Sequence, residues 1–255
     1  MTYSPDERRT VFGPLRGNLC ESGWVTGNDA PTTIATLSSD TVTSTPHPTS
    51  RSLLAEELIE DRKDDLRGGI KERRSLLDAR TLQGHADEIA RRVLDLTGSL
   101  GLCEGDTVAA YVSRSHEPGM FPTLDILLAA GLEVLVPVLG PSLDRCWGRY
   151  TGQDELAQLA PGRPLEPRGQ REEADAVGRA RLILVPALAI DDDGVRLGLG
   201  GGWYDRALLH ASADAVVVGV VYDDEAHHDL LPRADHDVPV GGVLTPTSWW
   251  RLRAA

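Results

Sequence analysis

Short apolar runs recur along the chain after residue 100 and predict the strands of a sheet. They are rich in Val, Ile, Leu and Ala and are bounded by Gly, Pro or Asp, a pattern typical of buried strands. The predicted strands cover residues 107–112, 133–139, 181–185 and 215–222, with a shorter one at 238–244. The segment 140–178 has several Pro and Gly residues and no clear period, so we expect a long irregular loop there.

Helical patterns lie before and between these runs. Residues 52–79 are rich in Leu, Glu, Arg and Ala, with Gly68 and Gly69 in the middle, and predict one kinked helix or two consecutive helices. Residues 84–96 carry an apolar face, and residues 122–130 begin with a proline suited to a first helical turn. Strands that alternate with helices predict a parallel sheet covered on both faces.

The first 50 residues differ from the rest of the chain. Residues 32–50 are rich in Thr, Ser and Pro and poor in large apolar side chains. Such a segment buries too little surface to offset the entropy lost on ordering. We therefore expect a disordered extension over 1–50 and one folded domain over 51–255.

Charge and cysteine content narrow the class of protein. The formal net charge of the 255 residues is −13, which disfavours a nucleic-acid surface and requires any anionic ligand to meet local positive charge. Three dispersed cysteines form no Cys-x-x-Cys pair, which favours reduced thiols. The sequence has no apolar run of about 20 residues and no apolar signal core, so we expect a cytoplasmic protein without a membrane partner.

The most distinctive stretch is 196–206, which reads RLGLGGGWYDR and contains four glycines within five residues. It joins a predicted strand to a predicted helix, where backbone amides and a helix N-terminus can bind an anion such as phosphate. A dinucleotide fingerprint would need glycine where Trp203 stands, and the chain has no Gly-Lys-Ser/Thr tripeptide of a Walker A loop. A flexible turn is the alternative, but the flanking Arg196, Asp205 and Arg206 favour the phosphate interpretation.

Two further segments could contribute to the same site. Lys63 and Arg67 are four residues apart and share one helix face, where they are either solvated or hold an anion. Glu117 lies in the polar loop 113–119, directly after a predicted strand. Ligands of parallel sheets bind beyond the carboxyl ends of the strands, so this loop and the glycine stretch would face one crevice. Glu117 could accept hydrogen bonds from an amino-bearing ring or lie in a surface turn.

Aromatic and acidic side chains leave alternatives open. Trp147 and Tyr150, in the expected loop, could stack on a planar ligand or fasten the loop to the core. Asp205 and Asp237 could bind a divalent cation together with phosphate oxygens. The histidines near the C-terminus have no spacing that demands zinc, and we interpret them as surface residues.

Taken together, these motifs resemble the 5-formyltetrahydrofolate cyclo-ligase family. The segment 185–191 and the stretch 194–206 resemble its signature. The resemblance extends over about 58–247 and includes further marks in the expected order: Lys-x-x-x-Arg at 63–67, the loop ending at 119, Trp147, Glu166-Pro167, and the segment 236–246. It implies a single-domain three-layer α/β/α sandwich with a mostly parallel sheet. It also implies the ATP-dependent conversion of 5-formyltetrahydrofolate to 5,10-methenyltetrahydrofolate, with release of ADP and phosphate.

The resemblance also implies roles for individual residues. Lys63 and Arg67 would contact ATP phosphates, Lys63 and Arg196 would neutralise the transferred charge, and Asp205 and Asp237 would hold Mg²⁺. The remaining ATP-binding residues would be those of the glycine stretch: Leu197, Gly198, Leu199, Gly200, Gly201, Gly202, Trp203 and Tyr204. The folate would be bordered by Val112, Glu117, Trp147, Gly200 and Gly202. We expect a monomer that acts on this small molecule.

Two other functions remain possible for such a sequence. A sugar-phosphate isomerase or a transferase on a similar sheet would use the glycine loop for a phosphate without Mg-ATP. A non-catalytic folate- or nucleotide-binding relative would need neither Lys63 nor Asp205. The cations brought from a distant helix favour the cyclo-ligase.

Overall fold

The computed structural model describes residues 50–140, 144–226, 229–234 and 237–252, with side chains described from residue 57 onward. The described residues all belong to one compact unit, 47–255. Residues 1–49 of the expected extension lie outside the described part. So do the three C-terminal histidines interpreted as surface residues: His227, His228 and His236.

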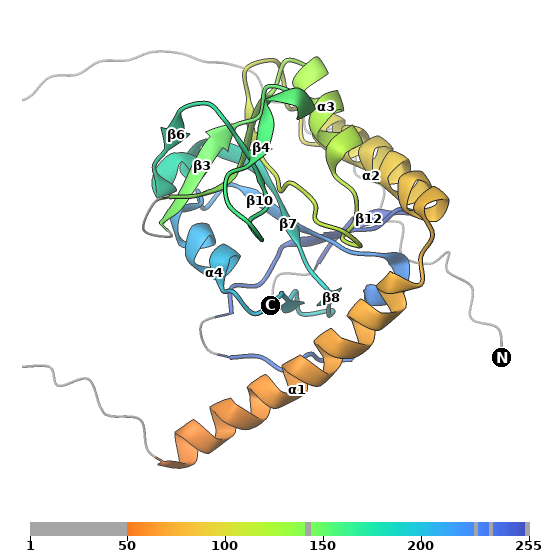
Figure 1. Ribbon diagram of the computed structural model, residues 1–255, viewed down its shortest axis with the longest axis vertical. Coiled ribbons are helices and arrows are strands. Elements are labelled where there is room, and N and C mark those ends of the chain that lie inside the picture. The colour runs from red at the N-terminus through yellow and green to blue at the C-terminus, as the bar shows by residue number, and fades with distance from the viewer. Residues whose placement is uncertain (1–49, 141–143, 227–228, 235–236, 253–255) are drawn as a thin grey trace, which may run out of the picture. The chain divides into compact units, whose positions relative to one another are not determined.

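An eight-stranded sheet forms the centre of this unit, with the strand order β12-β11-β10-β7-β1-β2-β3-β6 (Figure 1). Its five parallel strands are β1 (Thr107–Ala109), β2 (Glu133–Leu139), β7 (Ala180–Pro186), β10 (Val216–Val220) and β11 (Gly242–Leu244). Antiparallel strands extend both edges: β12 (Trp249–Arg251), β3 (Arg145–Arg149) and β6 (Arg171–Glu172). The sheet is therefore mostly parallel, as predicted.

The expectation of an irregular loop over 140–178 is wrong for most of that segment. It contains β3 and β6, the small β4–β5 pair (Leu156–Gln158 and Leu165–Pro167), and the 3₁₀ helices η2 (Gln153–Glu155) and η3 (Ala174–Arg179). The strand β3 reads RCWGR, with charged ends and a glycine, so it lacks the apolar run that marks a buried strand. Its pairing with β2 over five residue pairs, from Leu135 with Arg149 to Leu139 with Arg145, makes it a strand.

The helices differ from the predicted ranges at their starts. The first, α1 (Ser50–Ser75), is one helix that runs through Gly68 and Gly69. The second, α2 (Ala79–Ser99), begins earlier than predicted because Asp78 caps it, its carboxylate accepting a hydrogen bond of 2.7 Å from the Thr81 amide. The third, α3 (Phe121–Ala129), has the expected proline in its first turn. None of the described helices combines the length and apolar character needed to cross a membrane.

Alternate side chains of the strands fill the two sides of the sheet. Val108 and Leu182 pack into the core cluster that includes α2 and α3 residues, whereas Ala109 and Ile183 pack into the cluster that includes α4 (Trp203–Ala207), η3 and η4 (Leu208–His210). Figure 1 shows α2 and α3 together on one face and α4 on the other. The result is the predicted three-layer sandwich, with α1 extending beyond it.

Candidate active site

The glycine stretch is presented by a small hairpin beyond the end of β7. Its strands, β8 (Ala189–Ile190) and β9 (Arg196–Leu197), pair antiparallel. Asp191 closes the turn between them, since its buried carboxylate accepts hydrogen bonds from the amides of Val195 (2.8 Å) and Leu231 (2.9 Å). Gly194 has a φ of +80°, and a Cβ there would collide with the carbonyl oxygen of Val240. The turn thus fixes where the stretch begins.

The glycines themselves hold the backbone in conformations that other residues rarely adopt. Gly200 and Gly202 have φ values of +95° and +56°. Gly202 is the N-cap of α4, which spans only five residues before a 3₁₀ turn follows. The predicted helix is present over residues 203–210, but only its first five residues are α-helical. Any anion bound at the loop would rely on its backbone amides more than on a helix dipole.

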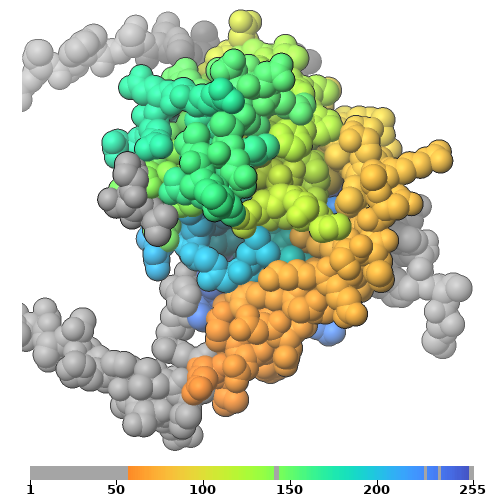
Figure 2. All heavy atoms as spheres, in the orientation of Figure 1, coloured from red at the N-terminus to blue at the C-terminus, as the bar shows by residue number. Residues whose placement is uncertain are grey.

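The helix α1 brings positive charge to this loop from the far end of the sequence. Its buried side chains, Lys63, Arg67, Ile70 and Arg74, form one stripe at helical spacing. The Nε of Arg67 donates to the carbonyl oxygen of Gly198 at 2.9 Å, and its Cζ lies 3.5 Å from where a Cβ on Gly200 would stand. Figure 2 shows the orange spheres of α1 against light-blue spheres from the region of residue 200. Lys63 and Arg67 therefore do not lie on a solvated face.

Both cations are held by carboxylates of the protein. The Nζ of Lys63, whose residue is only 5% exposed, lies 2.6 Å from Oδ2 of Asp237. Arg67 pairs with Glu60 and Asp64 at 2.6 Å each. Although burial acts against its charge, the hydrogen bonds that Arg67 donates to these two acids raise its pKa above the ordinary value. Positive charge is thereby kept next to the glycine loop.

Arg196 joins the start of the glycine stretch to two other parts of the site. One terminal nitrogen donates to Oδ1 of Asp205 at 2.6 Å, and the other donates to the carbonyl oxygen of Val238. The amide of Val238 also donates to Asp205, at 3.2 Å. This buried guanidinium is directed at protein atoms, so its geometry fits the positioning of Asp205 and the segment around Asp237.

The residues expected to hold Mg²⁺ converge on this network. Asp205 comes from α4 and is bonded to Arg196, whereas Asp237 comes from the segment before β11 and is bonded to Lys63. Within the described residues Oδ2 of Asp205 accepts no hydrogen bond, and no three His, Cys, Asp or Glu side chains gather into a metal-binding group. Two carboxylates beside a phosphate site suit Mg²⁺, which takes its other ligands from phosphate and water.

Glu117 lies in a second part of the site, beyond the end of β1. Its Oε2 accepts a hydrogen bond of 2.7 Å from the Arg114 amide, and its carbonyl oxygen accepts one of 3.2 Å from the Tyr222 hydroxyl. Burial raises the pKa of Glu117 above its ordinary value, and the Arg114 amide only partly opposes this. Burial, and then the charge of Glu117, raise the pKa of the Tyr111 and Tyr204 hydroxyls. Of the two alternatives for Glu117, an exposed surface turn fits less well, because its carboxylate is half-buried.

Other predicted contact residues differ in their surroundings. Val112 is buried near the end of β1, and Leu197 is buried against Ile70 of α1. Leu199 and Gly201 are exposed, while Trp203 and Tyr204 are half-buried. A ligand at the loop could therefore contact both the exposed residues Leu199 and Gly201 and the half-buried rings of Trp203 and Tyr204.

Trp147 does not lie where the sequence placed it. It belongs to β3 rather than to a loop, is 1% exposed, and packs edge to face on Trp203 with 5.1 Å between ring centroids. Tyr150 is also buried and donates to Asp125 of α3. Of the two roles left open for these aromatics, the buried packing fits the core better than stacking on a ligand.

Sequence reasoning missed the residues that support the site. The guanidinium of Arg74 makes two hydrogen bonds of 2.7 Å to the buried carboxylate of Glu225 and lies 5.2 Å from the Tyr222 ring centroid. The 63-67-70-74 spacing, which continues the helical stripe, could have identified Arg74. No local pattern marks Asp191 or Tyr222 as partners, because their contacts join segments distant in sequence.

Sequence comparison identifies relatives with consistent names. The profile of the 5-formyltetrahydrofolate cyclo-ligase family matches residues 59–246. A 5-formyltetrahydrofolate cyclo-ligase of Mycolicibacterium smegmatis is 40% identical over 190 residues, which are 72% of this chain and 93% of the relative. The enzyme of that name from Escherichia coli K12 is 29% identical over 184 residues, 71% of this chain and 98% of its own.

Solved structures agree with these relatives. The 5,10-methenyltetrahydrofolate synthetase of Aquifex aeolicus superposes with a TM-score of 0.63 at 26% identity, covering 76% of this chain and 94% of its own. The synthetase of Mycoplasma pneumoniae has a TM-score of 0.55 at 18% identity, covering 72% and 98%, which supports the shared fold.

Proposed function

Because the chain belongs to the 5-formyltetrahydrofolate cyclo-ligase family, we propose that it uses ATP to convert 5-formyltetrahydrofolate into 5,10-methenyltetrahydrofolate. The observation that carries the proposal is the stripe of buried cations on α1 that meets the glycine loop, with Arg67 bonded to Gly198. An isomerase that binds a single sugar phosphate has less use for a second, distant source of positive charge.

The reaction makes demands that this site can meet. A formamide oxygen is a poor leaving group, and transfer of the γ-phosphoryl group of ATP to that oxygen activates it. N10 of the folate then attacks the formyl carbon, the ring closes, and the C–O bond breaks to release phosphate. Phosphoryl transfer needs positioning and charge neutralisation more than a covalent protein catalyst.

Lys63 and Arg67 are the residues best suited to the phosphates. Both are buried, Arg67 contacts the backbone of the loop, and Lys63 lies one turn away on the same face of α1. Lys63 serves as the catalytic cation once phosphate oxygens share its ammonium with Asp237. Arg196 keeps Asp205 and the 237–240 segment in position and adds its charge to the phosphate end.

Asp205 and Asp237 are the carboxylates that would hold Mg²⁺ with the ATP phosphates. The ion would supply charge neutralisation on the phosphates. The chain's own contribution is to present the two carboxylates from different segments, Asp237 beside Lys63 and Asp205 beside Arg196.

Glu117 and its surroundings are suited to the folate. A half-buried carboxylate can accept hydrogen bonds from the amino group and ring N–H of a pterin. Val112, Gly200 and Gly202 lie on the segments that would border the same ligand, between the end of β1 and the glycine loop. ATP and reduced folates are available in the cytoplasm, where we expect the protein to act.

The proposal is tested by incubating the protein with 5-formyltetrahydrofolate, Mg²⁺ and ATP and following the near-ultraviolet absorbance of the methenyl product. Lys63→Ala is expected to lower kcat/KM for ATP by at least about 100-fold, since it removes a charge from the phosphate site. Lys71→Ala is the matched control, because Lys71 is exposed on the same helix and is the only other lysine in the chain.

Two results would contradict the proposal. If folded wild-type protein gives no ATP-dependent absorbance, the activity is not that of a cyclo-ligase. If Lys63→Ala keeps full activity at limiting ATP, the phosphate role assigned to Lys63 is wrong.

A further inference from the structure

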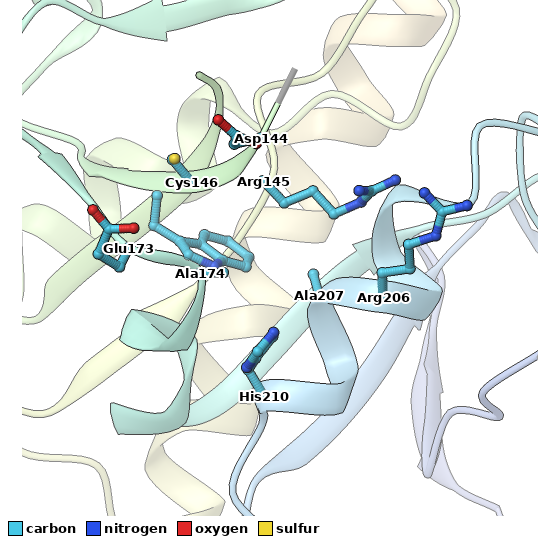
Figure 3. A pocket seen from close by; sticks show the side chains of 9 residues that line it. Asp144, Arg145, Cys146, Glu173, Ala174, Arg206, Ala207 and His210 are labelled. Carbon is cyan, nitrogen blue, oxygen red and sulfur yellow. The ribbon is translucent and has the colours of Figure 1, made fainter. Parts of the chain in front are cut away.

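A cavity of about 670 Å³ lies next to the glycine stretch, on the side of the sheet that carries α4. Its walls come from the start of β3, from the residues that open η3, and from α4 and η4 (Figure 3). Of the residues discussed above for phosphate, Mg²⁺ or folate, only Trp147 and Arg206 line it. The cavity therefore needs a separate explanation.

Two arginines dominate one end of this cavity. Figure 3 shows the side chains of Arg145, from β3, and Arg206, from α4, pointing toward one another. Within the described residues neither guanidinium makes an ion pair or a hydrogen bond, although most other arginines there do. Two like charges that face each other are unfavourable, and an anion between them makes the interaction favourable.

Two buried donors in the same wall also lack acceptors. The indole Nε1 of Trp147 and the Nε of Arg145 are shielded from solvent and donate to no atom. Because solvent does not reach these two atoms, a ligand in the cavity would be bound by the terminal nitrogens of the two arginines instead. A carboxylate suits those nitrogens, since the planar fork of arginine binds it through two parallel bonds.

Acidic groups confine the anion to one end. Asp144 and Glu173 also line the cavity, and Figure 3 shows Glu173 on the far side from Arg206. Carboxylates of a ligand would be repelled from Glu173 and drawn to the arginine pair. The cavity is thus polarised and would orient an elongated ligand that is anionic at one end only.

Aromatic contacts connect this cavity to the folate region. Trp147 packs on Trp203, and Trp203 packs on Tyr204 with 4.8 Å between ring centroids. Burial, and then the charge of Glu117, raise the pKa of the Tyr204 hydroxyl. A row of packed rings therefore connects the cavity wall at Trp147 with Tyr204, on which the charge of Glu117 acts.

We propose that Arg145 and Arg206 bind the carboxylates of the glutamate end of 5-formyltetrahydrofolate. The inference rests on the proposed function, because it assigns the second end of the same substrate. Glu117 would accept hydrogen bonds from the neutral pterin, and the arginine pair would receive the two carboxylates at the opposite end.

The test compares two substrates that differ only in this end. 5-Formyltetrahydropteroate has the pterin and the aminobenzoate but no glutamate. For 5-formyltetrahydrofolate, Arg145→Met and Arg206→Met are each expected to raise KM by roughly 10- to 100-fold with little change in kcat, since each removes a charge-assisted hydrogen bond to bound substrate. For wild type, the KM for 5-formyltetrahydropteroate should be higher than the KM for 5-formyltetrahydrofolate. Both variants should show the same KM for the pteroate substrate as wild type.

Arg168→Met is the matched control, because it removes the same charge from an exposed side chain outside the cavity lining. Circular dichroism and thermal unfolding show whether each variant is folded. Arg145→Lys, which keeps the charge but not the fork, should recover part of the lost affinity.

The outcomes separate this inference from the proposed function. If wild-type protein converts both substrates with similar KM, or if the variants weaken both substrates equally, the arginines do not bind the glutamate end and the inference is overturned. If wild-type protein converts neither substrate, it is the proposed function that fails.

Discussion

At the scale of single residues, Glu117 is a carboxylate whose burial lowers the stability of the folded protein when it is ionised. Burial raises its pKa, which means that the folded protein favours the protonated form. A group of this kind contributes most to stability below its unfolded pKa of about 4.5, and that contribution is lost as the pH rises through the higher folded pKa. At neutral pH an ionised Glu117 therefore lowers the free energy of unfolding.

Glu117→Gln should consequently separate stability from activity. At pH 7 to 8 the variant is expected to be more stable than wild type, and the difference should shrink as the pH falls toward 4.5. The same change should raise KM for the folate roughly 10- to 100-fold, because a neutral amide replaces a charged acceptor. Urea unfolding at several pH values and steady-state kinetics measure the two effects.

Glu117→Ala serves as the comparison, since it also removes the acceptor for the Arg114 amide. If the stability difference between Glu117→Gln and wild type stays constant from pH 4 to 8, folding does not raise the pKa of Glu117, and the prediction is wrong.

Single residues also show what the sequence could predict. The spacing of Lys63 and Arg67 predicts a shared helix face, and in the structure both are buried on it, with Arg67 bonded to Gly198 and Lys63 to Asp237. Trp147 was misplaced, because its burial depends on Trp203 and on β2, which are distant in sequence. A side chain's surroundings can be predicted when they are set by its own helix, and much less well when they come from elsewhere.

At the scale of elements, α1 is unusual in burying cations rather than an apolar face. Only Ile70 interrupts the stripe formed by Lys63, Arg67 and Arg74. Such a helix can pack only against a surface that supplies hydrogen-bond acceptors for its cations. Arg74 donates to the carboxylate of Glu225 and to the carbonyl oxygen of Ala187. Its attachment is therefore as much electrostatic as hydrophobic.

Arg74→Met should destabilise the fold by about 3 to 5 kcal/mol, because it leaves the buried Glu225 carboxylate without its partner. The neighbouring Arg73→Met is the control, with an expected change within about 0.5 kcal/mol, since its pair with Asp224 is exposed. The double change Arg74→Met with Glu225→Leu should recover much of the loss. Denaturant unfolding provides the measurement, and equal effects of the two single changes would contradict the role of the buried pair.

The parallel strands could be predicted because each buries a run of apolar side chains on both faces. The strand β3 could not, because it lies near the sheet edge and carries charged ends. The start of α2 could not be predicted from its apolar face, because the cap at Asp78 fixes where the helix begins.

At the scale of the whole molecule, every residue assigned to the site lies in the 47–255 unit. We therefore expect a variant lacking residues 1–46 to retain the kcat and KM values of the full chain. We also expect that variant to sediment as a monomer, because the proposed site draws on a single chain. Kinetics and analytical ultracentrifugation test these expectations, and a loss of activity on truncation would assign a role to the N-terminal residues.

The site combines segments from opposite ends of that unit. Lys63 and Asp237 are 174 residues apart, yet their side chains form one ion pair. During translation α1 leaves the ribosome while Asp237 has still to be added, so the nascent chain carries Lys63 without its carboxylate partner. A newly made molecule should thus acquire nucleotide binding only at the end of its synthesis, which protects incomplete chains from binding ATP unproductively.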